Sequence, residues 1–162
     1  MKTKRALFVL AGMLLSMAAC VPSGSDSTHM GTLIVASKSG DDVYFIDRQD
    51  GQILAVLPTG LQPHEVEVSH DGRWAVVCNY GDRQHPGHTL SVYDVLKAEK
   101  LRTIDLGEHT RPHGMKWISG TTRLLVTTEG SRHLLLVDIE TGEIVMAMDT
   151  DQAVAHMVAA SP

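Results

Sequence analysis

Val43-Tyr44-Phe45-Ile46-Asp47 is the first of three similar stretches that decide the fold of this chain. The other two are Leu90-Ser91-Val92-Tyr93-Asp94 and Leu134-Leu135-Leu136-Val137-Asp138, and each is an apolar-rich run that ends in aspartate. The three aspartates are 47 and 44 residues apart. A repeat with a period in the forties indicates one supersecondary unit that has been copied along the chain.

Each unit contains short strand candidates that are rich in Val, Leu, Ile and Thr and bounded by Gly and Asp turns. In the second unit they cover residues 64–69, 74–78, 89–94 and 100–106. In the third unit they cover residues 113–118, 123–128, 133–138 and 143–148. No segment has sustained helical periodicity. Four antiparallel strands every forty-odd residues predict the blades of an all-β propeller.

Three local patterns recur at the ends of these strands. A hairpin of two aliphatic residues, Asp and a later Gly occurs at Ile46–Gly51 and Val137–Gly142, and a Gly…Pro-His sequence at Gly60–His64 and Gly107–His113. Val68–Gly72 reads Val-Ser-His-Asp-Gly. With these patterns the chain resembles the YVTN-type β-propeller repeat over residues 32–162, in units of about 32–72, 73–121 and 122–162. The resemblance implies a propeller fold, in a family that includes both binding proteins and enzymes.

The two ends of the repeat suggest an incomplete ring of about three blades. The first unit has no innermost strand, and Ala155–Pro162 is expected to form an innermost strand with nothing after it. Propellers typically have four to eight blades, so three would leave apolar faces uncovered. Either the sequence is the N-terminal portion of a longer protein, or two chains self-associate to complete one ring.

Residues 1–19 read as a targeting segment. Lys2, Lys4 and Arg5 precede the apolar run Ala6–Leu15, which is too short to span a membrane, and small residues then lead to Cys20. This resembles a bacterial lipoprotein signal peptide, which implies lipidation of Cys20. Two acyl chains would anchor the protein to the membrane on the periplasmic or extracytoplasmic side of the cell envelope. An ordinary secretory signal with an incidental cysteine is the alternative. Residues 20–31 read as a flexible tether.

Composition excludes several classes of function. The chain has 19 acidic and 14 basic residues, a formal net charge of −5 and no basic stripe, which argues against nucleic acid as a partner. Cys78 lies in an apolar run and is expected to be a buried core thiol without a disulfide partner. The sequence contains no Cys-x-x-Cys-His, no adjacent cysteine pair, no nucleophile elbow and no phosphate loop.

Histidines supply the candidate site. His64, His113 and His156 occupy equivalent positions at the start of successive innermost strands, so we expect them near the mouth of the central channel. Imidazoles that converge there could bind a divalent transition metal or an anionic ligand, with Glu65 and Glu129 as oxygen ligands. The alternative is a packing role, in which each histidine hydrogen-bonds the neighbouring blade.

A lengthened loop on the same face adds further candidates for ligand binding. Gly81–His88 is longer than its counterparts in the other units and carries His85 and His88. Arg111 could pair with a carboxylate or phosphate on a ligand. A solvated loop and an interblade salt bridge remain the alternatives for these residues.

The sequence therefore predicts a lipid-anchored envelope β-propeller that binds a small ligand, a metal or an envelope protein through its His-rich face. No residue is assigned as catalytic. A metal-assisted hydrolase or lactonase-like enzyme with its site at the channel mouth is the alternative, because a bound metal can activate water. A fragment without activity of its own is the third reading.

Overall fold

The structure is a computed structural model that describes residues 31–161. The expected signal peptide, the lipidation site Cys20 and all of the tether except Gly31 lie outside these residues. Within the described residues no helix is both long and apolar enough to cross a membrane.

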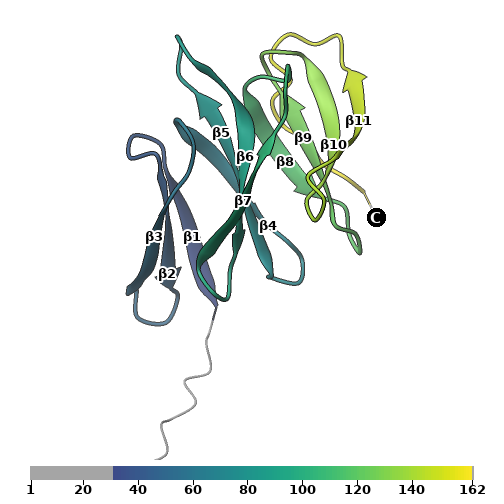
Figure 1. Cartoon of the computed structure of the whole chain (residues 1–162). Coiled ribbons are helices and arrows are strands. Elements are labelled where there is room, and N and C mark those ends of the chain that lie inside the picture. The colour runs from purple at the N-terminus through teal and green to yellow at the C-terminus, as the bar shows by residue number, and fades with distance from the viewer. Residues whose placement is uncertain (1–30, 162) are drawn as a thin grey trace, which may run out of the picture.

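The strands form three antiparallel sheets that stand side by side (Figure 1). The first sheet has the order β1-β2-β3, with β1 at Thr32–Ser37, β2 at Asp42–Asp47 and β3 at Ile53–Pro58. The second has the order β4-β5-β6-β7, with β4 at Pro63–Val68, β5 at Trp74–Gly81, β6 at Pro86–Asp94 and β7 at Glu99–Asp105. The third has the order β8-β9-β10-β11, with β8 at Pro112–Trp117, β9 at Arg123–Thr128, β10 at His133–Asp138 and β11 at Ile144–Asp149. The all-β class and the four-stranded blades are thus confirmed.

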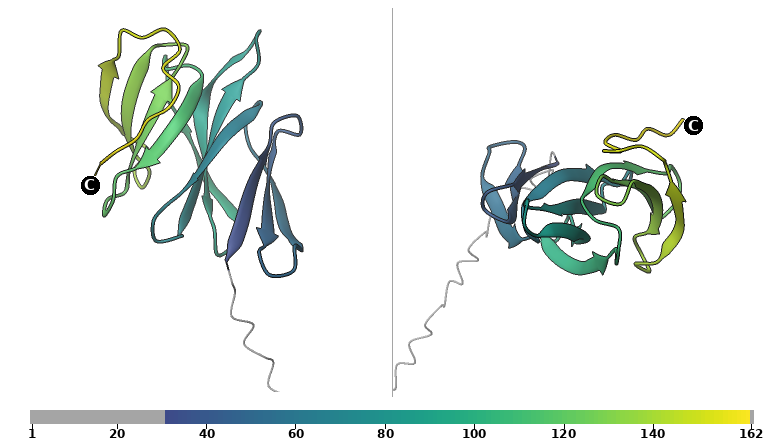
Figure 2. Two further views of the ribbon diagram at one scale, coloured as in Figure 1. Left: turned by 180° about the vertical axis from the view of Figure 1, so that it is seen from behind. Right: turned by 90° about the horizontal axis from the view of Figure 1, so that it is seen from above.

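The inner strands β4 and β8 lie next to each other, β4 also lies next to β1, and the starts of β4 and β8 lie at one end of the sheets. The first sheet has three strands, as the sequence predicts. The expectation of a strand at Ala155–Pro162 is wrong for its described part, because residues 155–161 form no ladder. This segment contacts β8 through His156, whose carbonyl accepts from the Gly114 N–H at 2.9 Å. Figure 2 shows the segment running back from β11 along the third sheet.

The repeated aspartates close the outer hairpins. Oδ1 of Asp47 accepts from the Gln49 N–H at 2.7 Å, Oδ1 of Asp94 from the Lys97 N–H at 2.9 Å, and Oδ1 of Asp138 from the Glu140 N–H at 3.0 Å. A short carboxylate that accepts from a backbone amide two or three residues later is what holds such a turn. These carboxylates therefore serve the fold.

The middle sheet is buried on both faces, which explains why the run from Trp74 to Cys78 lacks polar alternation. Val76 and Cys78 point into a core shared with the third sheet, whereas Ala75 and Val77 point into a core shared with the first sheet. In the second of these cores Phe45 and Tyr93 pack edge to face with ring centroids 5.8 Å apart. Full burial of one such aromatic side chain contributes about 1.5–3 kcal/mol.

The outer faces of the first and third sheets expose apolar side chains, as expected for an open arc. Leu33, Val35, Ile53 and Val56 are exposed on the first sheet, and Met148 is exposed on β11. Both flanks of the arc therefore carry exposed apolar side chains.

Candidate functional site

The same backbone conformation precedes each of the three equivalent histidines. His64 and His113 are the second residues of β4 and β8, and His156 lies in the segment after β11. Each follows, by two positions, a residue with left-handed backbone: Gln62 (φ 46°), Arg111 (φ 57°) and Val154 (φ 62°). A β-branched residue such as Val154 rarely adopts this conformation, and such strain tends to collect at functional sites.

With this backbone conformation, the three imidazoles lie close together. The ring centroids of His64 and His113 are 4.3 Å apart, and those of His113 and His156 are 3.8 Å apart. Oε1 of Glu129, which follows β9, lies 3.8 Å from Nε2 of His113 and 3.7 Å from Nε2 of His156. Glu65 lies on the other side, with its Oε1 3.5 Å from Nδ1 of His64.

Among residues 31–161 these side chains form two groups with metal-ligand spacing. One group is His64, Glu65 and His113, and the other is His113, Glu129 and His156. Within each group the potential ligand atoms all lie within 4.8 Å of one another. The five residues predicted as metal ligands are thus the five that converge, and His113 belongs to both groups.

Burial differs sharply across the cluster. The side chains of His113 and Glu129 are 3% and 9% exposed, whereas that of His156 is 55% exposed. Within the described chain, the Nδ1 atoms of His64 and His113 are buried and have no hydrogen-bond partner. Burial lowers the pKa of His113, and the neighbouring His64 and His156 lower it further. The cluster is therefore anchored in the interior and open to solvent at His156.

Tyr80 orients Glu129 and was not predicted from the sequence. Its hydroxyl donates to Oε2 of Glu129, and its ring lies 5.1 Å from that of His64. Burial raises the pKa of Tyr80, and the hydrogen bond to Glu129 raises it further, so the phenol keeps its proton. The repeat could have indicated Tyr80, because Tyr80 and Glu129 both precede a glycine in the sequence. The structure confirms that the two positions are equivalent, since their N–H groups donate to the carbonyls of Gln62 and Arg111.

Arg111 lies at the edge of the cluster. Its guanidinium carbon is 5.0 Å from the centroid of the Tyr80 ring, and its Nη2 donates to the Asp82 carbonyl at 2.8 Å. Arg111 thus ties the β5–β6 hairpin to the start of β8, and it also packs on Tyr80.

His85 and His88 stand apart from the cluster. The His85 side chain is 75% exposed and its Nδ1 lies 3.3 Å from Asp82, while His88 pairs with Asp105 at 2.9 Å. The prediction of a long loop at Gly81–His88 is wrong. Strands β5 and β6 extend until Gly81 pairs with Pro86, so only residues 82–85 form the turn. Neither histidine is in the two metal-spaced groups found among residues 31–161.

Comparisons with known proteins show the fold and nothing finer. No family model matches the chain, and no curated protein matches it. Among solved structures it is similar to Kuenenia stuttgartiensis hydrazine synthase, with a TM-score of 0.68 and 23% identity over 81% of this chain and 36% of that one. It is also similar to the dihydro-heme d1 dehydrogenase NirN in complex with DHE, with a TM-score of 0.63 and 16% identity over 76% of this chain and 26% of that one.

Both neighbours are β-propeller proteins, and this chain spans about a third of the first and a quarter of the second. Together with three sheets of three to four antiparallel strands, this likeness shows a β-propeller fold. The chain is an arc of propeller blades with a histidine cluster at one end of its inner strands.

Proposed function

We propose that this chain is a propeller-type binding module whose histidine cluster holds a divalent transition-metal ion. The observation that carries the proposal is the convergence of imidazole and carboxylate ligand atoms to within 4.8 Å in two groups that share His113. Imidazole nitrogens with a carboxylate oxygen suit Zn²⁺, Cu²⁺, Ni²⁺ and Fe²⁺ better than Mg²⁺ or Ca²⁺, which prefer oxygen ligands throughout.

The distances support His113, Glu129 and His156 as the main ligand set. Bonds of about 2.0–2.2 Å place the ligand atoms of a tetrahedral ion roughly 3.3–3.6 Å apart. Oε1 of Glu129 is 3.8 Å from Nε2 of His113 and 3.7 Å from Nε2 of His156, so a contraction of a few tenths of an ångström completes these edges. His64 and Glu65 lie beside this set and supply the second group.

Tyr80 supports the same reading. A metal-bound carboxylate is commonly held by a further hydrogen bond that fixes its orientation. Tyr80 gives that bond to Oε2 of Glu129, which leaves Oε1 facing the two histidines.

The test is a metal titration of the purified protein by calorimetry, with Zn²⁺ as the probe and metal content measured after dialysis. His156→Ala and Glu129→Gln are expected to weaken Zn²⁺ binding at least about tenfold, since each removes one ligand. His85→Ala is the matched control, because it deletes an exposed histidine outside the cluster. Binding that is absent in the wild type, or unchanged in both ligand variants, would overturn the proposal.

A second candidate function, metal-assisted hydrolysis, is favoured by the exposure of His156. A catalytic metal needs protein ligands and one open position for water, and the half-exposed side of the cluster provides such access. Zinc-loaded protein should then hydrolyse an activated ester or a lactone, and Glu129→Gln should abolish the activity. Stoichiometric metal with no turnover of either substrate would leave the binding function and remove this one.

We also propose that the protein is anchored in a bacterial cell envelope through lipid on Cys20. The support is the basic, apolar and small-residue pattern of residues 1–19 directly before that cysteine. Mass spectrometry of the N-terminal peptide from a membrane fraction should show a diacylated Cys20. Recovery of an unmodified peptide in the soluble fraction would contradict it.

A further inference from the structure

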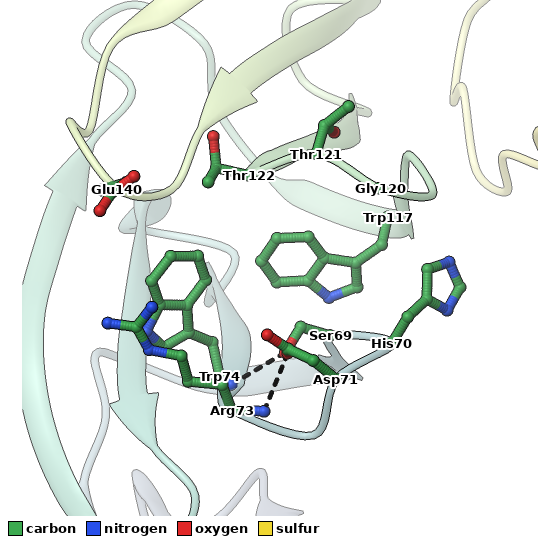
Figure 3. Close-up of a pocket in the computed structure, with 10 residues that line it drawn as sticks. All are labelled: Ser69, His70, Asp71, Arg73, Trp74, Trp117, Gly120, Thr121, Thr122 and Glu140. Atoms are coloured by element: carbon green, nitrogen blue, oxygen red, sulfur yellow. Dashed lines mark hydrogen bonds between the residues drawn. The ribbon is translucent and has the colours of Figure 1, made fainter.

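A second candidate site lies at the other end of the inner strands. A cavity of about 310 Å³ lies between the second and third sheets. Its walls are the turns at Ser69–Arg73 and Gly120–Thr122, the indoles of Trp74 and Trp117, and Glu140 (Figure 3). His64 and Ser69 are at opposite ends of β4, so this cavity is separate from the histidine cluster. Its volume is within the range of small-molecule sites.

Two indoles form the apolar wall. The rings of Trp74 and Trp117 have centroids 6.2 Å apart and planes inclined by 24°. The guanidinium of Arg73 lies 4.6 Å from the Trp74 ring, so a cation already interacts with that indole. The π face of an indole is negative and attracts partially positive C–H groups as well as cations.

Trp117 carries a donor that needs an acceptor. Its side chain is 2% exposed, and within the described residues its Nε1 is buried without a hydrogen-bond partner. A buried donor left unpaired destabilises the folded state. Figure 3 shows the nitrogen edge of this ring facing the turn that contains Ser69 and Asp71. A ligand between the ring and the turn could accept from Nε1.

Carboxylates at the opening provide acceptors. Asp71 and Glu140 both line the cavity and are exposed. Oδ1 of Asp71 accepts from the Ser69 hydroxyl at 2.6 Å and from the Arg73 N–H at 3.0 Å. These bonds, the one from Ser69 first, hold the pKa of Asp71 below its ordinary value, so it is an ionised acceptor at neutral pH.

We propose that this cavity binds a neutral sugar ring, a pyranose of a glycan. A sugar hydroxyl both accepts and donates, so one ring can take the Trp117 N–H and give hydrogens to Asp71 and Glu140, while its C–H groups contact the parts of the two indoles that line the cavity. An organic cation would satisfy the carboxylates and leave the Trp117 donor unpaired. An anion would meet two carboxylates, with Arg73 and His70 as the basic residues of the lining.

Intrinsic fluorescence reports on this cavity, because the two tryptophans of the chain both line it. The probes are methyl β-glucopyranoside, methyl β-galactopyranoside and chitobiose, with choline as the cation and gluconate as the anion. The expected result is a saturable fluorescence change with at least one sugar and none with choline or gluconate. Glu140→Gln should weaken sugar binding at least tenfold, since a hydrogen bond to a charged acceptor is stronger than one to a neutral acceptor. Glu143→Gln, on the same hairpin but outside the cavity, is the control.

Trp117→Phe keeps an aromatic ring and removes the N–H donor, and calorimetry with the best sugar should show at least a tenfold loss while far-UV circular dichroism is unchanged. His156→Ala should bind the sugar as the wild type does, which separates this site from the metal cluster. Saturation by choline alone would make the cavity a cation site and overturn the proposal. A flat response to every sugar, or equal affinity in Glu140→Gln and Glu143→Gln, would also overturn it.

Discussion

Gly114→Ala should detach one metal ligand without changing any ligand residue. Gly114 follows His113 in β8, and its N–H donates to the carbonyl of His156 at 2.9 Å. The hydroxyl of Thr127 donates to the same carbonyl at 2.8 Å. A Cβ on residue 114 would lie 2.2 Å from that oxygen, and Gly114 does not have left-handed backbone, so alanine fits its conformation and only the contact is forbidden.

The displacement can be estimated from the contact. Cβ atoms essentially never approach other heavy atoms more closely than 3.0 Å, so the terminal segment must retreat by about 0.8 Å or more. Metal–ligand distances tolerate only about ±0.2 Å. His156 should therefore stop binding the ion, and affinity for Zn²⁺ should fall about 10- to 100-fold. Loss of the two hydrogen bonds to the His156 carbonyl should destabilise the segment by about 2 kcal/mol.

The assay is competition for Zn²⁺ against a chromophoric chelator, with Gly114→Ala, His156→Ala and the double variant compared with the wild type. Because both substitutions remove the same ligand, the double variant should bind no more weakly than His156→Ala alone. Far-UV circular dichroism should show the three sheets intact in every variant. Wild-type affinity in Gly114→Ala, or losses that add in the double variant, would refute the reasoning.

Three further predictions concern single side chains. Tyr80→Phe should weaken Zn²⁺ binding about tenfold, because Glu129 loses the hydrogen bond that orients it. The chelator competition assay measures this loss, and unchanged affinity would show that Tyr80 does not position Glu129. Cys78, whose burial raises its pKa to about 12, should resist iodoacetamide in the native protein and react in denaturant, as peptide mass spectrometry can show; fast native alkylation would contradict this. Burial lowers the pKa of His109 below 6.5, so the unfolded chain binds its proton first and the free energy of unfolding should fall as pH drops from about 7 to about 5. His109→Gln should flatten this slope in urea unfolding, and an identical slope would exclude His109 as the cause.

Local chemistry explains why the strands were predictable. The expected strands at residues 123–128 and 133–138 agree with β9 and β10 at every residue, because alternation and turn residues act within a few positions. The strand expected at Ala155–Pro162 does not form over residues 155–161, for a non-local reason. The segment has strand propensity but pairs with no neighbouring strand. A backbone hydrogen bond from Gly114 to His156 holds it against β8.

From the sequence, the repeat predicts which residues of the candidate site are equivalent, but not which of them are in contact. Equivalence between units placed His64, His113 and His156 on one face of the propeller, and the structure brings them together. The repeat could not tell which of its positions touch across sheets. Tyr80 and Trp117 act through neighbours in another sheet, Glu129 and Trp74, and such contacts follow from how the sheets pack.

The double burial of β5 means that the parity of a residue's position decides which interface it controls. Shortening a side chain at Ala75 or Val77 loosens the joint to the first sheet, whereas shortening Val76 or Cys78 loosens the joint to the third. The histidine cluster straddles only the second joint. Substitutions at the odd positions can therefore alter the packing against the first sheet while the histidine cluster keeps its geometry.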